Sequence, residues 1–211
     1  MKEDVNKELE KDYYFSEKYV DKDRFVSYFW QNQLVRKLKN IKNILEIGAG
    51  NNIVHSILQK QGYSVKTLDI NEKLSPDFSG SVCDMHGVPV NTFDIVLCAE
   101  VLEHLPFEDF IKSLNEIHRV TKKYAIISLP YWGYTFGIRF RLPFLGKKTF
   151  QYKISGIKNH EFNGQHYWEI GKKGYPVKKI KEQIEKSGFE IKNSFWDLDD
   201  PYHYYFVLEK I

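Results

Sequence analysis

A glycine-containing loop is the first feature of this sequence that could do chemistry. Residues 44–52 read ILEIGAGNN, so an apolar run ends at Gly48, a second glycine follows at position 50, and two asparagines come next. Glycine has no Cβ, so a ligand can lie close against the backbone there. A carboxylate, Glu46, precedes the first glycine by two residues. The pattern predicts that this loop holds a nucleotide-type cofactor.

Two common nucleotide-binding patterns fit the loop poorly. A dinucleotide fingerprint needs a third glycine where this chain has Ile53, and a Walker loop needs Gly-Lys-Ser/Thr after the glycines. Asp69 ends the next apolar run and could accept hydrogen bonds from the ribose hydroxyls of NAD or of another adenosine-containing cofactor. Taken alone, the glycines could also serve only a tight turn.

The surrounding segments predict the sheet that positions this loop. Helical periodicity is expected at residues 24–39, 52–61, 107–121 and 177–189. Strands are expected at residues 43–47, 63–70, 80–84, 93–99, 124–130, 189–196 and 203–210. Apolar strands that alternate with helices are typical of a parallel sheet covered on both faces. No helix separates the last two strands, so we predict a three-layer α/β/α Rossmann-like fold with a mostly parallel seven-stranded sheet whose last strand is antiparallel.

Four blocks of this sequence resemble the class I S-adenosylmethionine (SAM) methyltransferases, specifically the small methyltransferase-domain type. The blocks are LEIGAGN, TLDI, CDMHGVP and FDIVLCAEVLEHL, and the resemblance covers about residues 40–130. The family often has a further glycine where this chain has Asn52, and asparagine is the next most tolerant residue if that backbone is left-handed. The resemblance implies a SAM-dependent methyltransferase and favours SAM over NAD. A SAM-binding scaffold or sensor without catalysis is a third interpretation.

The resemblance also implies roles for individual residues. Glu46 would order the loop and reach the amino end of the cofactor, Asp69 would bind its ribose, and Asp84 with the backbone of Met85 would meet its adenine. The main chain at Cys98 and Ala99 would face its methionine moiety. The full expected cofactor-binding set is Glu46, Gly48, Ala49, Gly50, Asn51, Asp69, Ile70, Asp84, Met85, Cys98 and Ala99.

A long segment between the fifth strand and the last helix is expected to cover the acceptor. Residues 130–174 hold eleven aromatic residues and eight Lys or Arg against two acids. We interpret them as an inserted lid, aromatic inside and basic at its rim, and a small satellite core is the alternative. The charge suits an anionic small-molecule acceptor, which ranks above RNA because no RNA-binding motif is visible.

A group of acids and histidines could supply catalysis. The sequence EVLEH places Glu100, Glu103 and His104 on one face if it is helical, and the lid adds His160 and His166. We expect Glu103, His104 and His166 to be catalytic, with His104 as a general base for an oxygen or nitrogen acceptor. The block also resembles the small-RNA 3′-end and ubiquinone-pathway O-methyltransferases, which implies a divalent metal as a less favoured alternative.

Composition limits the remaining choices. The formal charge of +3 is too small to indicate nucleic acid by itself, and no run is apolar enough to span a bilayer. Cys83 and Cys98 lie in apolar surroundings without a C-x-x-C pair, and the charged N-terminus does not read as a signal peptide. We expect a cytoplasmic enzyme whose two cysteines are reduced. We expect one domain over residues 1–211, in which residues 1–40 form an N-terminal helical cover.

Overall fold

The computed structural model describes residues 13–14, 16–17, 19–144 and 146–211. Its main sheet has seven strands in the order β3-β2-β1-β4-β5-β9-β8. The bounds are β1 Asn43–Ile47, β2 Ser64–Asp69, β3 Phe78–Ser79, β4 Phe93–Ala99, β5 Thr121–Pro130, β8 Phe189–Asp197 and β9 Asp200–Lys210. In this sheet β9 runs antiparallel to both β5 and β8, and the other described strand pairs are parallel. The predicted fold class is therefore confirmed, including the antiparallel last strand.

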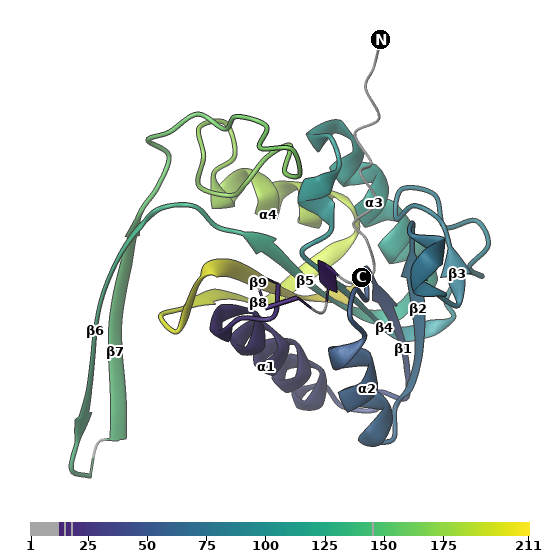
Figure 1. Cartoon of the computed structure of the whole chain (residues 1–211), viewed down its shortest axis with the longest axis horizontal. Helices are drawn as coiled ribbons and strands as arrows, with labels where there is room; N and C mark the ends of the chain where they lie inside the picture. The colour runs from purple at the N-terminus through teal and green to yellow at the C-terminus, as the bar shows by residue number, and fades with distance from the viewer. Residues whose placement is uncertain (1–12, 15, 18, 145) are drawn as a thin grey trace.

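Helices cover both faces of this sheet (Figure 1). Helices α1 (Lys22–Lys37) and α2 (Ile53–Lys60) pack on one face, and α3 (Phe107–Val120) and α4 (Val177–Lys186) pack on the other. Successive strand residues point to opposite faces, so Ile44 and Leu45 of β1 enter different cores. This double burial explains why the central strands are nearly continuous apolar runs.

Two predicted elements differ from the structure. The third strand was expected at residues 80–84, but β3 covers only Phe78–Ser79 and the expected residues form turns. Ser81 explains this because its hydroxyl and carbonyl accept hydrogen bonds from the backbone amides of Cys83 and Asp84, which closes a turn. The helical cover expected over residues 1–40 is described in part: residues 13–14 have 3₁₀ geometry, residues 16–17 and 19–20 form bends and turns, and α1 occupies Lys22–Lys37.

The segment after β5 contains a two-stranded ribbon that extends from the body of the molecule (Figure 1). It consists of β6 (Tyr134–Leu142) and β7 (Gly146–Ile154), which pair only with each other. Residues 155–176 then return to the body and lead into α4. The single lid expected over residues 130–174 is thus divided into a projecting ribbon and a returning segment.

Two short 3₁₀ helices, Glu72–Leu74 and Leu102–His104, follow the carboxyl ends of β2 and β4. They stand at the edge of the sheet where ligands of open α/β folds bind. Within the described residues, no helix combines the length and the apolar character needed to cross a bilayer.

Candidate active site

The loop after β1 has the backbone that its glycines allow. Gly48 and Gly50 have φ angles of 72° and 52°, in the region that L side chains rarely adopt. A Cβ on Gly48 would overlap the side chain of Val101. Asn52, at the start of α2, is left-handed with φ 59° and ψ 18°. The backbone at this position is therefore left-handed, a conformation that asparagine tolerates better than most residues.

A pocket opens beside this loop. From β1, β4, α2 and the loop it is lined by Glu46, Ile47, Gly48, Ala49, Asn51, Val54, Leu97 and Ala99. The N-terminal segment contributes Tyr19, Arg24, Tyr28 and Gln31. Of the expected cofactor-binding residues, Glu46, Gly48, Ala49, Asn51 and Ala99 line this pocket together. Gly50 lies against Tyr14 and Tyr19, close to the same opening.

Glu46 is a buried acid without a compensating partner. Only 5% of its surface is exposed, and its Oε2 has no hydrogen-bond partner within the described structure. Nδ1 of the His55 imidazole lies 3.9 Å from this oxygen, and burial lowers the pKa of His55, so this ring does not supply a compensating charge near pH 7. Burial raises the pKa of Glu46 to about 8 because an ionised carboxylate is costly away from water. A cationic ligand in this pocket would restore the charge of this carboxylate.

Arg24 supplies the opposite charge in the same pocket. Its guanidinium carbon lies 4.6 Å from the centroid of the Tyr19 ring. The pKa of Arg24 is raised by Tyr19 and Glu100, although burial opposes this. The N-cap acid Asp21, whose Oδ1 accepts from the Arg24 amide at 2.8 Å, begins α1 there. From the sequence this stretch was expected to form only a helical cover. The tyrosines that cluster near Arg24 in the sequence were the one signal that could have indicated a role in the pocket.

The N-terminal segment is fastened directly to the cofactor loop. The side-chain amide of Asn51 donates to the hydroxyl of Tyr28 at 2.9 Å and to the carbonyl of Tyr14 at 3.2 Å. Burial raises the pKa of Tyr19 above its usual range, so its phenol stays neutral. Tyr19 and Tyr28 therefore line one side of the pocket with aromatic groups, and Tyr14 lies against Gly50.

Asp69 ends β2 near the loop, as expected. Its Oδ1 accepts a hydrogen bond from the amide of Asn71 at 2.9 Å. Burial raises the pKa of this carboxyl, while backbone amides of Asn71, Ile70 and Gly50 act in the opposite direction. The next residue, Ile70, is 54% exposed. The Asp69 carboxyl therefore offers a hydrogen-bond acceptor beside the loop, and Ile70 offers an apolar surface.

Other expected cofactor residues are placed less directly. Asp84 is exposed, with Oδ1 2.5 Å from Nδ1 of His86. The amide of Met85 donates to Glu116 and its carbonyl accepts from Arg119, at 2.7 and 2.6 Å. These bonds occupy the backbone groups that were expected to meet adenine. Cys98 is fully buried in β4.

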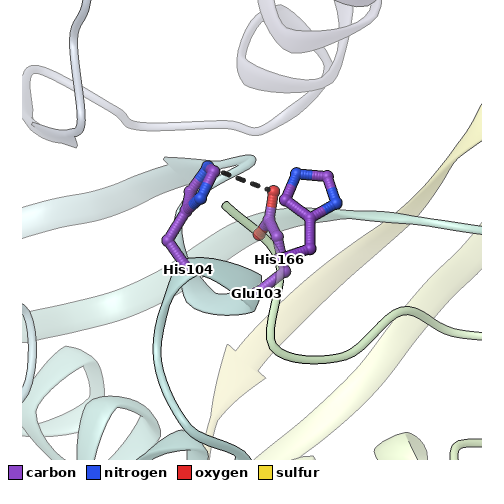
Figure 2. Close-up of side chains that lie close together, drawn as sticks. All are labelled: Glu103, His104 and His166. Carbon is purple, nitrogen blue, oxygen red and sulfur yellow. Dashed lines mark ion pairs between the residues drawn. The ribbon is translucent and has the colours of Figure 1, made fainter. Parts of the chain in front are cut away.

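A second group of side chains gathers just beyond β4 (Figure 2). Glu103 and His104 come from the 3₁₀ helix and His166 comes from the returning segment, and one ligand atom from each lies within 4.8 Å of the others. Nε2 of His104 is 3.9 Å from Oε1 of Glu103. The amide of Tyr167 donates to the carbonyl of Glu103 at 2.9 Å, which holds the two segments together. The structure thus assembles all three residues expected to be catalytic.

Each imidazole is oriented by a hydrogen bond at its Nδ1. Nδ1 of His104 lies 3.1 Å from the carbonyl oxygen of Gln165, and Nδ1 of His166 lies 3.1 Å from Oε1 of Glu169. A carbonyl and a carboxylate oxygen can only accept, so each ring donates from Nδ1 and keeps a lone pair on Nε2 when neutral. Burial, and then the neighbouring His166, lower the pKa of His104 to about 4. This ring is therefore neutral near pH 7, although 42% of its side chain is exposed.

Glu103 is the most buried member of this group. Its side chain is fully buried, and neither carboxyl oxygen has a hydrogen-bond partner within the described structure. Burial, with a contribution from Glu100, raises its pKa well above the usual range. The group accordingly combines a neutral buried carboxyl with two imidazoles that present Nε2.

Glu100 and His160 do not join the group as expected. Glu100 has a φ of 56°, which breaks helical geometry and turns its carboxylate away from one shared face. Its oxygens accept from the Ser128 hydroxyl at 2.9 Å and lie 3.4 Å from Nε2 of His203. His160 instead bonds through Nε2 to the carbonyl of His166 at 2.8 Å. The prediction of a shared helical face for Glu100, Glu103 and His104 is therefore wrong.

Comparisons with known proteins concern the domain type and the fold. Residues 45–129 match the family model described as a methyltransferase domain. One similar solved structure is the 1,6-didemethyltoxoflavin-N1-methyltransferase of Burkholderia thailandensis with S-adenosylhomocysteine and 1,6-didemethyltoxoflavin. It is 15% identical, with a TM-score of 0.62 and a match that covers 92% of this chain and 81% of that one.

Two further structures have the same fold. A SAM-dependent methyltransferase from Archaeoglobus fulgidus is 15% identical, with a TM-score of 0.62 and coverage of 95% and 100% of the two chains. The glycopeptide N-methyltransferase MtfA in complex with S-adenosylhomocysteine is 10% identical, with a TM-score of 0.58 and coverage of 92% and 91%. No curated protein matches the sequence.

Proposed function

We propose that this chain, whose residues 45–129 match a methyltransferase domain, is a SAM-dependent enzyme that methylates an oxygen or nitrogen of an anionic small molecule. The observation that carries this proposal is the group Glu103, His104 and His166. Glu103 and His104 follow the carboxyl end of β4, four and five residues after Ala99 of the cofactor pocket, and His166 joins them there. A nucleophile bound there would lie next to the methyl donor.

The cofactor pocket fits the charged end of SAM. The unpaired Glu46 carboxyl suits an ammonium group, and the Arg24 guanidinium suits a carboxylate. Gly48 and Gly50 let the backbone approach the ligand, and Asp69 is the proposed acceptor for ribose hydroxyls. Bound SAM supplies a methyl group on a sulfonium, which is already activated for transfer. The residues of this chain must therefore mainly hold the acceptor in line and exclude water.

In this proposal His104 takes up the proton that the acceptor loses. Its Nδ1–H is held by the Gln165 carbonyl, which leaves Nε2 as the atom that takes up a proton. Oε1 of the buried Glu103 carboxyl lies 3.9 Å away and would face the imidazolium that then forms. His166 is fixed by Glu169 and borders the same space. In this role His166 positions the acceptor beside His104.

The charge of the returning segment supports an anionic acceptor. The ammonium groups of Lys172 and Lys158 lie 4.7 and 5.5 Å from the ring centroid of Trp132. Trp132 follows the end of β5, on the segment that leads away from the sheet edge. These cations with an aromatic face suit a phosphorylated or carboxylated molecule. Release of S-adenosylhomocysteine with a panel of anionic hydroxyl and amine compounds tests the proposal, and no release with any acceptor would favour a scaffold instead.

Asp69→Ala should weaken the binding of SAM by roughly 1.5–3 kcal/mol, or about 10- to 150-fold in Kd. The variant removes the carboxylate proposed to accept hydrogen bonds from the ribose. Isothermal titration calorimetry measures this directly. Glu72→Ala is the matched control, because it removes an exposed carboxylate three residues further along and should leave Kd unchanged. Equal affinities for both variants would remove the ribose assignment.

The same three residues favour a second candidate, a divalent metal site. Histidine ligands of metals usually donate their outer N–H to a carbonyl or carboxylate, and both imidazoles do so here. Glu103 adds a carboxyl without a hydrogen-bond partner. These residues fit a cation, and Glu103, His104 and His166 would hold it. A bound ion would supply a positive charge that lowers the pKa of a hydroxyl acceptor.

Excess EDTA should leave turnover unchanged if His104 acts as the base without a metal. Turnover with an identified acceptor is compared before and after EDTA, and Mn²⁺ is titrated into the ligand-free enzyme and into Glu103→Gln by calorimetry. Saturable Mn²⁺ binding that disappears in Glu103→Gln, together with activity restored by Mn²⁺, would assign the cluster to a metal. The calorimetric readout does not depend on knowing the acceptor.

A further inference from the structure

The ribbon of β6 and β7 (residues 134–154, here called the arm) has two chemically different faces. Strand partners run from Tyr134 with Ile154 to Leu142 with Gly146. Side chains alternate between the two faces of a ribbon, so even-numbered residues share one face. That face carries Tyr134, Phe136, Ile138, Phe140, Leu142, Phe150, Tyr152 and Ile154, with Lys148 as its one charged member in the described structure.

The apolar face is open to solvent. All eight of its apolar side chains are exposed, and Ile138 and Phe150 reach 70% and 68%. Phe144, beside the turn, is completely exposed, with a relative value of 107%. Contiguous exposed apolar surfaces of this kind are uncommon on isolated soluble proteins and mark interaction sites. A two-stranded hairpin also gains little stability without a covering partner.

The opposite face fastens the arm to the body. Gly137 lies against Leu198 so closely that a Cβ there would overlap it, and Arg139 pairs with Asp199 in the turn between β8 and β9. At the base, the ammonium group of Lys153 donates to the carbonyls of Tyr131 and Pro201. The body therefore covers part of the polar face and leaves the apolar face uncovered.

The charge of the arm has one sign. Residues 134–154 contain five Lys or Arg and no Asp or Glu. Arg139 and Lys153 are engaged with the body, while Arg141, Lys147 and Lys148 make no ion pair within the described residues. These three cations flank the turn, where a hollow is lined by Arg141, Leu142, Pro143, Phe144 and Gly146. The exposed end of the arm thus combines apolar side chains with unpaired positive charge.

We propose that the arm docks on an anionic lipid bilayer, with Phe144 and the apolar face in the interfacial region and the three cations near the headgroups. Amphipathic elements with aromatic and aliphatic side chains on one face bind membranes in this manner. Lys and Arg near an anionic surface add attraction that salt screens. The inference concerns the arm alone and does not depend on which acceptor the enzyme methylates.

Two other occupants suit these features less well. A second copy of the chain would bring another arm with five cations and no acids against the first, which is repulsive. Single-stranded RNA binds platforms on which aromatic rings and cations share a face. Here the apolar face includes Ile138, Leu142 and Ile154, which cannot stack on bases, and most cations lie on the other face.

Docking through the arm would place the active site near the membrane. The carboxyl end of β5 continues into the arm, and the segment that leaves the arm carries His166. The bridge between Tyr131 and Ile170 joins the start and the return of this insertion at its base.

The test uses the full chain and sedimentation with lipid vesicles. Wild-type protein should bind vesicles of phosphatidylcholine with about one quarter phosphatidylserine, bind pure phosphatidylcholine far less, and lose binding at high salt. The triple variant Arg141→Gln, Lys147→Gln, Lys148→Gln should bind on the order of 100-fold more weakly. Phe144→Ser should bind roughly tenfold more weakly, and Phe144→Trp should restore binding.

The matched control removes the same charge from the body, with Lys39→Gln, Lys60→Gln and Lys186→Gln at exposed positions. It should bind vesicles like the wild type, and all variants should keep the wild-type unfolding temperature. An equal loss in the control, or equal binding to neutral and anionic vesicles, would overturn the proposal. So would binding of a single-stranded RNA oligonucleotide without vesicle binding, or a dimer in gel filtration that Ile138→Asn dissociates.

Discussion

His104→Ala should lower kcat by about 100- to 10,000-fold, the range that removal of a positioned general base produces. Its Nε2 carries the lone pair that faces Glu103, because Nδ1 is engaged with the Gln165 carbonyl. The ring is neutral near pH 7, so its Nε2 lone pair is available to a bound acceptor. The measurement is S-adenosylhomocysteine release at saturating SAM with the acceptor found in the panel. Calorimetry should show SAM affinity within about twofold of wild type, because the loss belongs to the chemical step.

His86→Ala is the control for this variant. His86 is an exposed histidine that contacts Asp84 on a different loop, so its removal should leave kcat unchanged at saturating SAM. His104→Gln keeps a polar side chain but cannot take up the proton, and it should be as impaired as His104→Ala. Full activity of both His104 variants would mean that the acceptor loses its proton to water or to another group.

The backbone of the glycine loop was largely predictable because its constraints are local. Gly48 and Gly50 adopt positive φ where a strand meets a helix, and such residues can be recognised without knowing the rest of the fold. Asn52 follows the same rule, since asparagine is the residue type that, after glycine, best tolerates the left-handed backbone found there. The strand order places Asp69 and Ala99 beside the loop for the same reason, because parallel strands end at one edge.

What sequence reasoning missed depends on contacts between distant segments. Arg24 and Tyr19 reach the pocket only because α1 packs beside α2, and no spacing in the sequence fixes that approach. Glu100 has a helical spacing to Glu103, yet its positive φ sends it to Ser128 and His203. The role of Glu169 as a partner of His166 likewise appears only once the returning segment is folded.

The arm is a different case, because its signal was present in the sequence. Tyr134, Phe136, Ile138 and Phe140 alternate with polar or small residues, which is the period of a strand. Aromatic density and charge were instead combined into one lid over residues 130–174. Composition reports what a segment contains, whereas periodicity reports which side chains share a face. Only the second separates a projecting ribbon from a segment folded over the site.

Trp168→Ala should lower the free energy of unfolding by about 3–5 kcal/mol, the range for truncation of a large buried aromatic side chain. Trp168 is fully buried and contacts Phe107, Phe110 and Tyr175, with ring centroids 5.0, 5.1 and 5.9 Å away. Its Nε1–H donates to the carbonyl of Leu105 at 3.1 Å. The variant therefore leaves a cavity and removes the partner of the Leu105 carbonyl. Leu105 is the residue that follows His104. Urea denaturation followed by circular dichroism measures the loss.

Trp132→Ala removes the same side chain from the same insertion and serves as the control. Trp132 is only partly buried and its ring meets Lys158 and Lys172 at the surface, so its removal should cost less than half as much. Since Trp168 joins the returning segment to the segment that carries His104, its variant should also lose turnover at temperatures where it is still folded. An equal, small loss of stability in both variants would mean that the returning segment does not pack on α3 in solution, and the site that unites His104 with His166 would then lose its support.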